Sequence, residues 1–145
     1  MFVEKGVEGL PLEGEKTPMV EAMQRVWTGR EPEQTAPVLH TLKLQGKEAV
    51  ENVVVPANVS LTSEVNAEDR EEQTLTYVWE VLDEATILGF GGSYEPRPQR
   101  VGDVAVTQEA TYTFRMETAG NYRLYVYVLD GTGFVATANI PFRVE

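Results

Sequence analysis

Within residues 119–133, which read AGNYRLYVYVLDGTG, the side chains alternate strictly between two sets. Alternation with a period of two predicts a β-strand, because successive side chains point to opposite faces of a sheet. One face receives a set that is typical of a core: Tyr122, Leu124, Val126 and Val128. The other face receives Arg123, Tyr125, Tyr127 and Leu129. This second set is too aromatic for a face that only meets water, so that side of the sheet needs a cover or a partner.

Short patterns of the same kind recur along most of the chain and predict further strands. The strands are expected at 37–44, 58–65, 74–82, 104–116, 121–129 and 133–144, with a short one near 49–54. Turn signals separate them, among them Gly46-Lys47 and Asp130-Gly131. Many short strands at this spacing predict an all-β fold in which two sheets pack face to face as a β-sandwich.

The N-terminal part has a different pattern, and we expect an extension or linker of residues 1–35 ahead of a sandwich that spans 36–145. The segment TPMVEAMQRVWTG predicts a helix near 17–28, with a capping threonine, a proline in the first turn and a terminal glycine. Its apolar side chains share one face: Met19, Val20, Met23, Val26 and Trp27. A helix this short is marginal alone, so it needs an apolar surface to lie on. The opening residues read like the interior of a larger protein, of which we expect this chain to be a part.

Charge and composition disfavour several classes of function. The chain has 145 residues and a formal net charge of −11, which disfavours nucleic acid and membrane as partners because both attract Lys and Arg patches. It has no cysteine, which excludes disulfides and thiolate chemistry. His40 stands alone, beside no nucleophile motif, and we expect it at the surface or at a sheet edge. We therefore predict that this region is not an enzyme in its own right.

The connection 84–103, which reads EATILGFGGSYEPRPQRVGD, is too long to be a simple turn. Connections of this length are usually functional or disordered, and the aromatic residues and prolines argue against plain disorder. Its candidate ligand-binding residues are Phe90, Tyr94, Arg97 and Arg100. In the alternative interpretation, Phe90 and Tyr94 pack under the connection and close one end of the sandwich.

Two acidic turns, 66–73 (NAEDREEQ) and 129–133 (LDGTG), raise the question of calcium. Calcium needs several oxygen ligands that converge at about 2.3–2.6 Å. The first turn is rich in Glu and carries Arg70, so we interpret it as a solvated turn. Asp130 is expected to bind the backbone of its own turn. We predict no cofactor, with a structural calcium ion as the alternative.

Two further positions indicate a particular kind of sandwich. Alternation in LTYVWEVLD (75–83) places Trp79 in the core, where a tryptophan is typical of immunoglobulin-like domains. Tyr122 follows a glycine turn at the start of the next-to-last strand, which is the tyrosine-corner position, and Leu124 occupies the place of an antibody domain's second cysteine. The pattern resembles cysteine-free bacterial immunoglobulin-like domains of the PKD type. More broadly, four stretches resemble the C-terminal accessory domain of secreted bacterial glycoside hydrolases: TPMVEAMQRVWTGREPEQTAPVL, LTYVWEV, GGSYEPRP and YRLYVYVLDGTGFVATANIPFRV.

The resemblance implies a non-catalytic accessory module of a polysaccharide-degrading enzyme, outside the cytoplasm, that binds polysaccharide or oligosaccharide weakly. Its second partner would be the catalytic domain of the parent enzyme. The alternative is a structural spacer or docking domain that packs on a catalytic barrel and binds no glycan.

The two interpretations predict different roles for the aromatic face of the 121–129 strand. If the face binds glycan, Tyr125 and Tyr127 stack on sugar rings. Arg123 and Asn139 then bond to the hydroxyl groups of the sugar. If the face does not bind glycan, the helix near 17–28 lies across it and covers the tyrosines.

Overall fold

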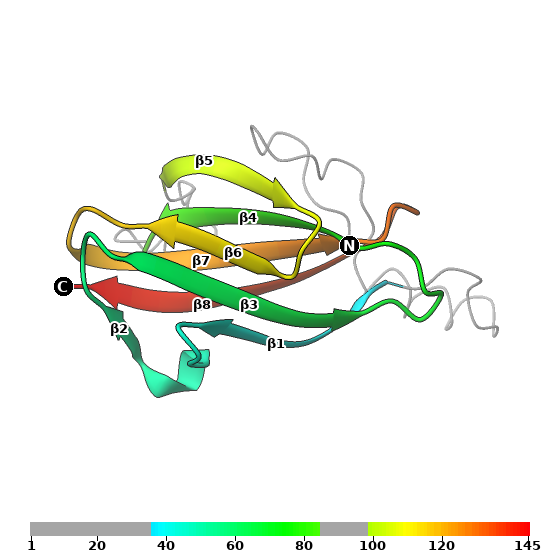
Figure 1. Cartoon of the computed structure of the whole chain (residues 1–145), viewed down its shortest axis with the longest axis horizontal. Helices are drawn as coiled ribbons and strands as arrows, with labels where there is room; N and C mark the ends of the chain where they lie inside the picture. Colours follow the sequence, from blue (N-terminus) through cyan, green and yellow to red (C-terminus); the bar gives the residue numbers. More distant parts are fainter. Residues whose placement is uncertain (1–35, 85–98) are drawn as a thin grey trace, which may run out of the picture.

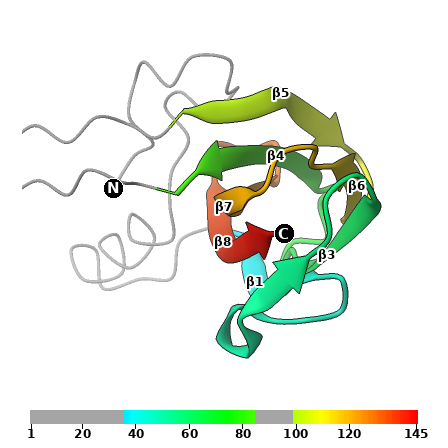
Figure 2. The ribbon, with the colours of Figure 1, turned by 90° about the vertical axis from the view of Figure 1, so that its left-hand side faces the viewer.

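The computed structural model describes residues 36–84 and 99–145, which form two facing β-sheets (Figure 1). The elements are β1 (Val38–Leu44), η1 (Ala49–Glu51), β2 (Val53–Val55), β3 (Ser60–Glu68), β4 (Thr76–Asp83), β5 (Arg100–Thr107), β6 (Thr111–Arg115), β7 (Gly120–Leu129) and β8 (Val135–Val144). One sheet has the order β1-β3-β6 and the other the order β2-β8-β7-β4-β5. Figure 2 shows β4, β7 and β8 in one layer and β3 and β6 in the other. The predicted immunoglobulin-like two-sheet sandwich is confirmed.

The pairing of strands is antiparallel except at β2, which runs parallel to β8. The extension 1–35, with its predicted helix near 17–28, lies outside the described residues. Among the residues that are described, no helix is long and apolar enough to cross a membrane.

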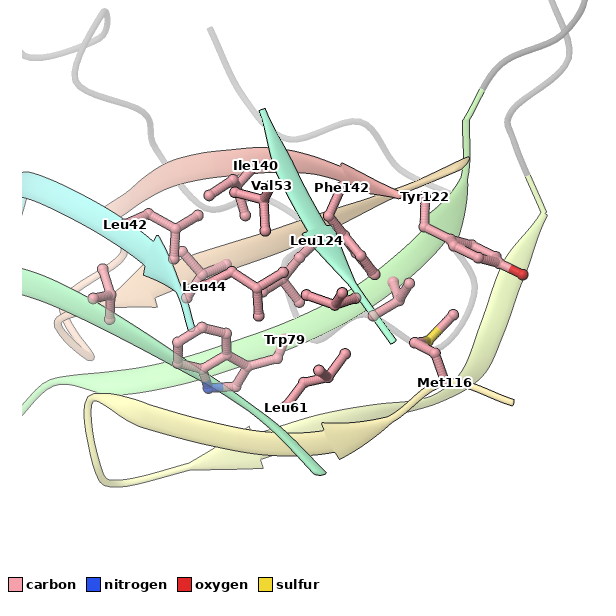
Figure 3. Close-up of a cluster of buried hydrophobic side chains, with 14 of the residues drawn as sticks. Leu42, Leu44, Val53, Leu61, Trp79, Met116, Tyr122, Leu124, Ile140 and Phe142 are labelled. Carbon is pink, nitrogen blue, oxygen red and sulfur yellow. The ribbon is translucent and has the colours of Figure 1, made fainter. Parts of the chain in front are cut away.

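Trp79 lies at the centre of the core with none of its surface exposed (Figure 3). Its ring stacks between Tyr77 and Tyr112, with centroid separations of 6.4 and 5.4 Å. The indole Nε1 donates a hydrogen bond of 2.9 Å to Oγ1 of Thr107, so the one polar atom of this buried ring is satisfied. The prediction that Trp79 points inward is confirmed.

The tyrosine corner is present as well. The Tyr122 side chain is buried, and its hydroxyl donates a hydrogen bond of 2.9 Å to the backbone oxygen of Thr118. A Cβ atom at Gly120 would lie 3.3 Å from that hydroxyl, so the glycine leaves room for the ring. Leu124, two residues further along β7, is fully buried.

The predicted strand 104–116 is wrong as a single element. The structure divides it into β5, which pairs with β4, and β6, which pairs with β3 in the other sheet. Alternation continues from Val104 to Phe114 through the turn, and no glycine or proline marks the crossing. The turn is held instead by Thr107, whose hydroxyl donates a hydrogen bond of 2.8 Å to the backbone oxygen of Glu109.

The short strand predicted near 49–54 is also corrected in part. Residues 49–51 form the 3-10 helix η1, and only Val53–Val55 form a strand. Asn52 ends η1 in the left-handed conformation, with φ of 52°, and its backbone N–H bonds to the oxygen of Ala49 at 3.4 Å. Asparagine adopts this conformation more readily than most residues, which suits it to the position between η1 and β2.

Candidate functional site

The outer face of the five-stranded sheet, which is the face turned away from the core, carries the tyrosines that the sequence analysis selected. Strand register places Tyr125 of β7 between Glu80 of β4 and Asn139 of β8. One step along the same face, Arg123 lies between Leu82 and Pro141. The central strands of the sheet therefore hold these side chains in fixed positions.

Glu80 is the most buried charged side chain on the outer face, with 1% of its surface exposed. Tyr127 donates a hydrogen bond of 2.7 Å to Oε1 of Glu80, and Nε of Arg100 lies 3.1 Å from Oε2. A buried carboxylate is destabilising unless it is paired and hydrogen-bonded. Both carboxylate oxygens of Glu80 have such a partner.

A β-bulge in β5 explains how Arg100 reaches Glu80. Trp79 pairs with Ala105 and Val81 pairs with Val101, so residues 102–104 of β5 lie opposite Glu80 alone. Gly102 takes φ of +74° in this bulge, a conformation that glycine adopts without strain. Arg100 pairs with Leu82 in the register and approaches Glu80 diagonally across the face.

Arg123 forms the second charged group of the outer face. Its Nε lies 3.3 Å from Oε2 of Glu84 and its Nη2 lies 3.2 Å from Oε1, so the contact is bidentate. Its Nη1 donates a hydrogen bond of 2.7 Å to Oδ1 of Asn139. The guanidinium group is therefore fixed between Glu84, which follows β4, and Asn139 of β8, and the amide nitrogen of Asn139 remains able to donate to a ligand.

Tyr125 and Tyr127 lie side by side, both partly buried. Their ring centroids are 6.4 Å apart and their planes differ by 13°. The hydroxyl of Tyr127 is engaged by Glu80, whereas that of Tyr125 has no hydrogen-bond partner among residues 36–84 and 99–145. Two nearly parallel rings on a rigid strand, next to an arginine and an amide, can stack on a flat ligand and bond to its polar edge.

The outer face thus brings together four of the predicted site residues: Arg100, Arg123, Tyr125 and Tyr127. Arg100 was expected in the long connection, and the structure places it on β5 with its side chain on Glu80. Phe90, Tyr94 and Arg97 lie outside the described residues. That any of the seven binds a ligand stays a prediction.

Glu80 and Glu84 are site residues that the sequence analysis did not select. The signal for Glu80 was a single acidic residue inside the apolar strand TYVWEVLD, at a position that alternation turns away from the core. Its partner Arg100 is 20 residues away in the sequence and Tyr127 is 47 away. Only the strand pairing reveals these contacts.

The other positions considered from the sequence make structural contacts, as far as they lie among the described residues. Oδ1 of Asp130 accepts hydrogen bonds from Thr132 N at 2.8 Å, Thr132 Oγ1 at 2.7 Å and Phe134 N at 3.4 Å, so Asp130 binds its own turn as predicted. His40 is exposed, with its Nε2 3.3 Å from Oε2 of Glu68. No group of three or more His, Cys, Asp or Glu side chains in the described ranges could hold a metal ion.

Burial alters the pKa values of two tyrosines in or beside the core. Burial raises the pKa of Tyr77 above 10.0. Burial first, and the Asp103 charge second, raise the pKa of Tyr112 above the same value. Both hydroxyls therefore remain neutral at ordinary pH.

No family model matches this chain, and no curated protein matches it. Among solved structures it resembles the PKD1 domain of the Vibrio cholerae metalloprotease PrtV, with 19% identity, a TM-score of 0.45 and coverage of 76% of this chain and 98% of that chain. It also resembles a superoxide reductase (neelaredoxin) from Ignicoccus hospitalis, with 15% identity, a TM-score of 0.41 and coverage of 90% and 95%. A third structure, the PmoD soluble domain from Methylocystis sp., has 11% identity, a TM-score of 0.41 and coverage of 79% and 94%.

These likenesses are too distant to carry an argument about activity. The PKD domain among them belongs to a protease. The immunoglobulin-like character of the sandwich rests on its own strand order and tyrosine corner. The link to carbohydrate-active enzymes remains a proposal.

Proposed function

We propose that this chain is a non-catalytic accessory module of a polysaccharide-degrading enzyme and that it binds glycan weakly through the outer face of its five-stranded sheet. The observation that carries the proposal is the nearly parallel pair Tyr125 and Tyr127, with an interplanar angle of 13°. Arg123 and Asn139 border the pair and are joined by a hydrogen bond of 2.7 Å. The apolar C–H face of a sugar ring stacks on such tyrosines, and its hydroxyl groups bond to the neighbouring polar atoms.

The expected affinity is low. Two stacked aromatic rings contribute about 1 kcal/mol each, and two or three exposed hydrogen bonds contribute about 1 kcal/mol each. The sum, about −4 to −5 kcal/mol, corresponds to a Kd of roughly 0.1–1 mM. Binding of this strength is useful to an enzyme that tethers the module beside its catalytic domain, because the tether raises the effective concentration.

The pairing of charges supports a non-catalytic role. Glycoside hydrolysis commonly uses two carboxyl groups on either side of the scissile bond. On the outer face Glu80 is buried against Arg100 and Tyr127, and Glu84 is bound in bidentate fashion by Arg123. These carboxylates are therefore occupied in holding the face together.

The chemistry of the face favours a neutral glycan. The net charge of −11 opposes the approach of an anionic polymer. The proposed partners are thus a neutral polysaccharide and the catalytic domain of the parent enzyme, and the proposed location is outside the cytoplasm, where such polymers occur. Nucleic acid and membrane are not proposed as partners.

A second candidate function, a spacer or docking domain without glycan binding, is favoured by one specific observation. The outer side chains of β4 are nearly inaccessible: Val78 is 0%, Glu80 1% and Leu82 4% exposed. A face whose β4 side chains are covered is better suited to packing against another domain than to binding a glycan. The two candidates differ in whether Tyr125 and Tyr127 contact a sugar.

Affinity electrophoresis distinguishes the two candidates. Native gels containing xylan, laminarin, mixed-linkage β-glucan or glucomannan should retard the protein in at least one case, and Tyr125→Ala should abolish the retardation. Thr111→Ala, an exposed change on β6 of the other sheet, is the matched control and should migrate as the wild type. Absence of retardation of the wild type in every gel would leave the spacer function standing, and equal retardation of wild type and Tyr125→Ala would place the binding site elsewhere.

A further inference from the structure

A pocket lies at one end of the outer face, beyond Arg123. Its volume is about 350 Å³, which is within the range of pockets that hold small ligands. The lining residues come from η1, β2, β7, β8 and the end of β4: Ala49, Asn52, Val53, Val54, Glu84, Asn121, Pro141, Phe142 and Arg143. None of these lining residues is among the sequence-predicted binding residues.

The pocket lies on the same face of the sheet as the tyrosine pair. Asn121 pairs with Arg143, Arg123 with Pro141, and Tyr125 with Asn139, so these three steps follow one another along the outer face of β7 and β8. From Asn121 to Tyr127 the chain advances six residues, about 20 Å at the rise of a β-strand. Glu84 belongs to the pocket and binds Arg123, so the Arg123–Glu84 ion pair forms the boundary between the two places.

The charges of the pocket are already paired. Glu84 is held by Arg123, and Nη2 of Arg143 lies 2.5 Å from Oε1 of Glu145. A charged ligand would have to compete with these contacts. The pocket therefore favours a neutral ligand.

Two amide side chains remain available to such a ligand. Asn52 and Asn121 are exposed, and neither side chain has a hydrogen-bond partner among the described residues. Each amide offers one acceptor and two donors. Val54 and Pro141 supply apolar surface beside them. A sugar unit has hydroxyl groups on its edge and C–H groups on its face, so it matches two amides that lie beside an apolar surface.

We propose that this pocket is a second glycan subsite, which receives one neutral sugar unit of the same chain that stacks on Tyr125 and Tyr127. The inference rests on the proposed function and extends it by naming the second contact and a ligand length that reaches both places. A disaccharide reaches only one of the two places, whereas a hexasaccharide reaches both.

Binding and NMR titration of the whole chain test the inference. The probes are cellohexaose, xylohexaose, laminarihexaose and mannohexaose with their disaccharides. We expect one hexasaccharide to shift the side-chain amide signals of Asn52 and Asn121 together with the backbone amides of Tyr125 and Tyr127. Ala49→Phe, which fills the pocket from an exposed position, should weaken hexasaccharide binding by more than about five-fold, because it removes more than the one hydrogen bond to which that factor corresponds.

Two control variants separate occupation of the pocket from general damage. Val50→Phe adds the same ring at the neighbouring position, which is 85% exposed and outside the pocket, and should bind as the wild type. Asn121→Ala should weaken binding about five-fold by removing one amide, whereas Asn66→Ala, an exposed change on β3, should not.

The outcomes distinguish this inference from the function on which it rests. Shifts confined to the tyrosines, with Ala49→Phe binding as the wild type, would overturn the subsite and leave the proposed function intact. Shifts at Asn52 and Asn121 that persist unchanged in Tyr125→Ala would overturn the claim that one chain contacts both places. No shift at either place with any probe would contradict both proposals.

Discussion

Strand β7 carries tyrosines on both of its faces, and the two faces hold their hydroxyl groups in different ways. On the core side, Tyr122 donates to a neutral backbone oxygen four residues earlier, at Thr118. On the outer side, Tyr127 donates to the carboxylate of Glu80, which is 47 residues away and also binds Arg100. The core face is thus held by apolar packing with local hydrogen bonds, and the outer face by charge pairs between strands.

Because the two faces are stabilised in different ways, we expect them to respond differently to mutation. On the core face, stability should depend on the volume of the side chain that is removed. On the outer face, it should depend on whether a charge loses its partner. The following changes test that difference, from the largest expected effect to the smallest.

Trp79→Ala should lower the free energy of unfolding by about 3–5 kcal/mol, because it removes a fully buried ring and leaves a cavity between Tyr77 and Tyr112. Urea denaturation followed by far-UV circular dichroism measures the loss. Trp79→Phe, which keeps an aromatic ring, should lose less. A loss below about 1 kcal/mol for Trp79→Ala would mean that the ring is not the centre of the core.

Glu80→Ala should lower the free energy of unfolding by about 2–4 kcal/mol, because it leaves Arg100 without its ion-pair partner on Glu80. The double variant Glu80→Met with Arg100→Met should be more stable than Glu80→Ala, since it removes the Arg100 charge together with the carboxylate that binds it. Denaturation midpoints of the three proteins test this. A double variant no more stable than Glu80→Ala would contradict the role given to charge pairing.

Tyr127→Phe should destabilise the protein more than Tyr122→Phe. The first change removes a hydrogen bond to a charged acceptor, an effect of about 1.5–3 kcal/mol, and the second removes one to a neutral acceptor, an effect of about 1 kcal/mol. Both variants keep the ring, so the packing is matched. Thermal unfolding of the pair decides the order, and a larger loss for Tyr122→Phe would reverse the comparison.

Arg123→Ala should have the smallest effect on stability, about 0–1 kcal/mol, because the Arg123 and Glu84 side chains are each about one third exposed. The difference from the wild type should shrink as sodium chloride is raised, since salt screens exposed pairs. A difference that does not change with salt would show that Arg123 stabilises the face by packing instead.

The core face could be predicted from sequence because alternation depends only on residues that are close in the chain. Alternation within β4 and β7 turns Trp79, Tyr122 and Leu124 inward, and the structure confirms all three. The same rule failed at 104–116, because alternation continued through a turn that no glycine or proline marks. A local pattern predicts a strand, but it does not predict which other strand it pairs with.

The contacts of the outer face could not be predicted from a local pattern, because they depend on how distant strands pair. The contact between Glu80 and Arg100 requires both the β4–β5 register and the bulge at residues 102–104. The pocket beyond Arg123 needs the parallel pairing of β2 with β8, which brings Val54 beside Arg143. Each of these follows from the register of distant strands, which alternation leaves undetermined.

Calorimetric titration of Tyr125→Ala and Tyr125→Phe tests the central claim most directly, with the glycan that most retards the wild type as the ligand. The proposed stacking requires the ring and not the hydroxyl, so Tyr125→Phe should bind within about five-fold of the wild type, the effect of one lost hydrogen bond. Tyr125→Ala should lose measurable binding. Affinity that is unchanged in Tyr125→Ala would contradict the account, because the tyrosine pair would then not be where the glycan binds.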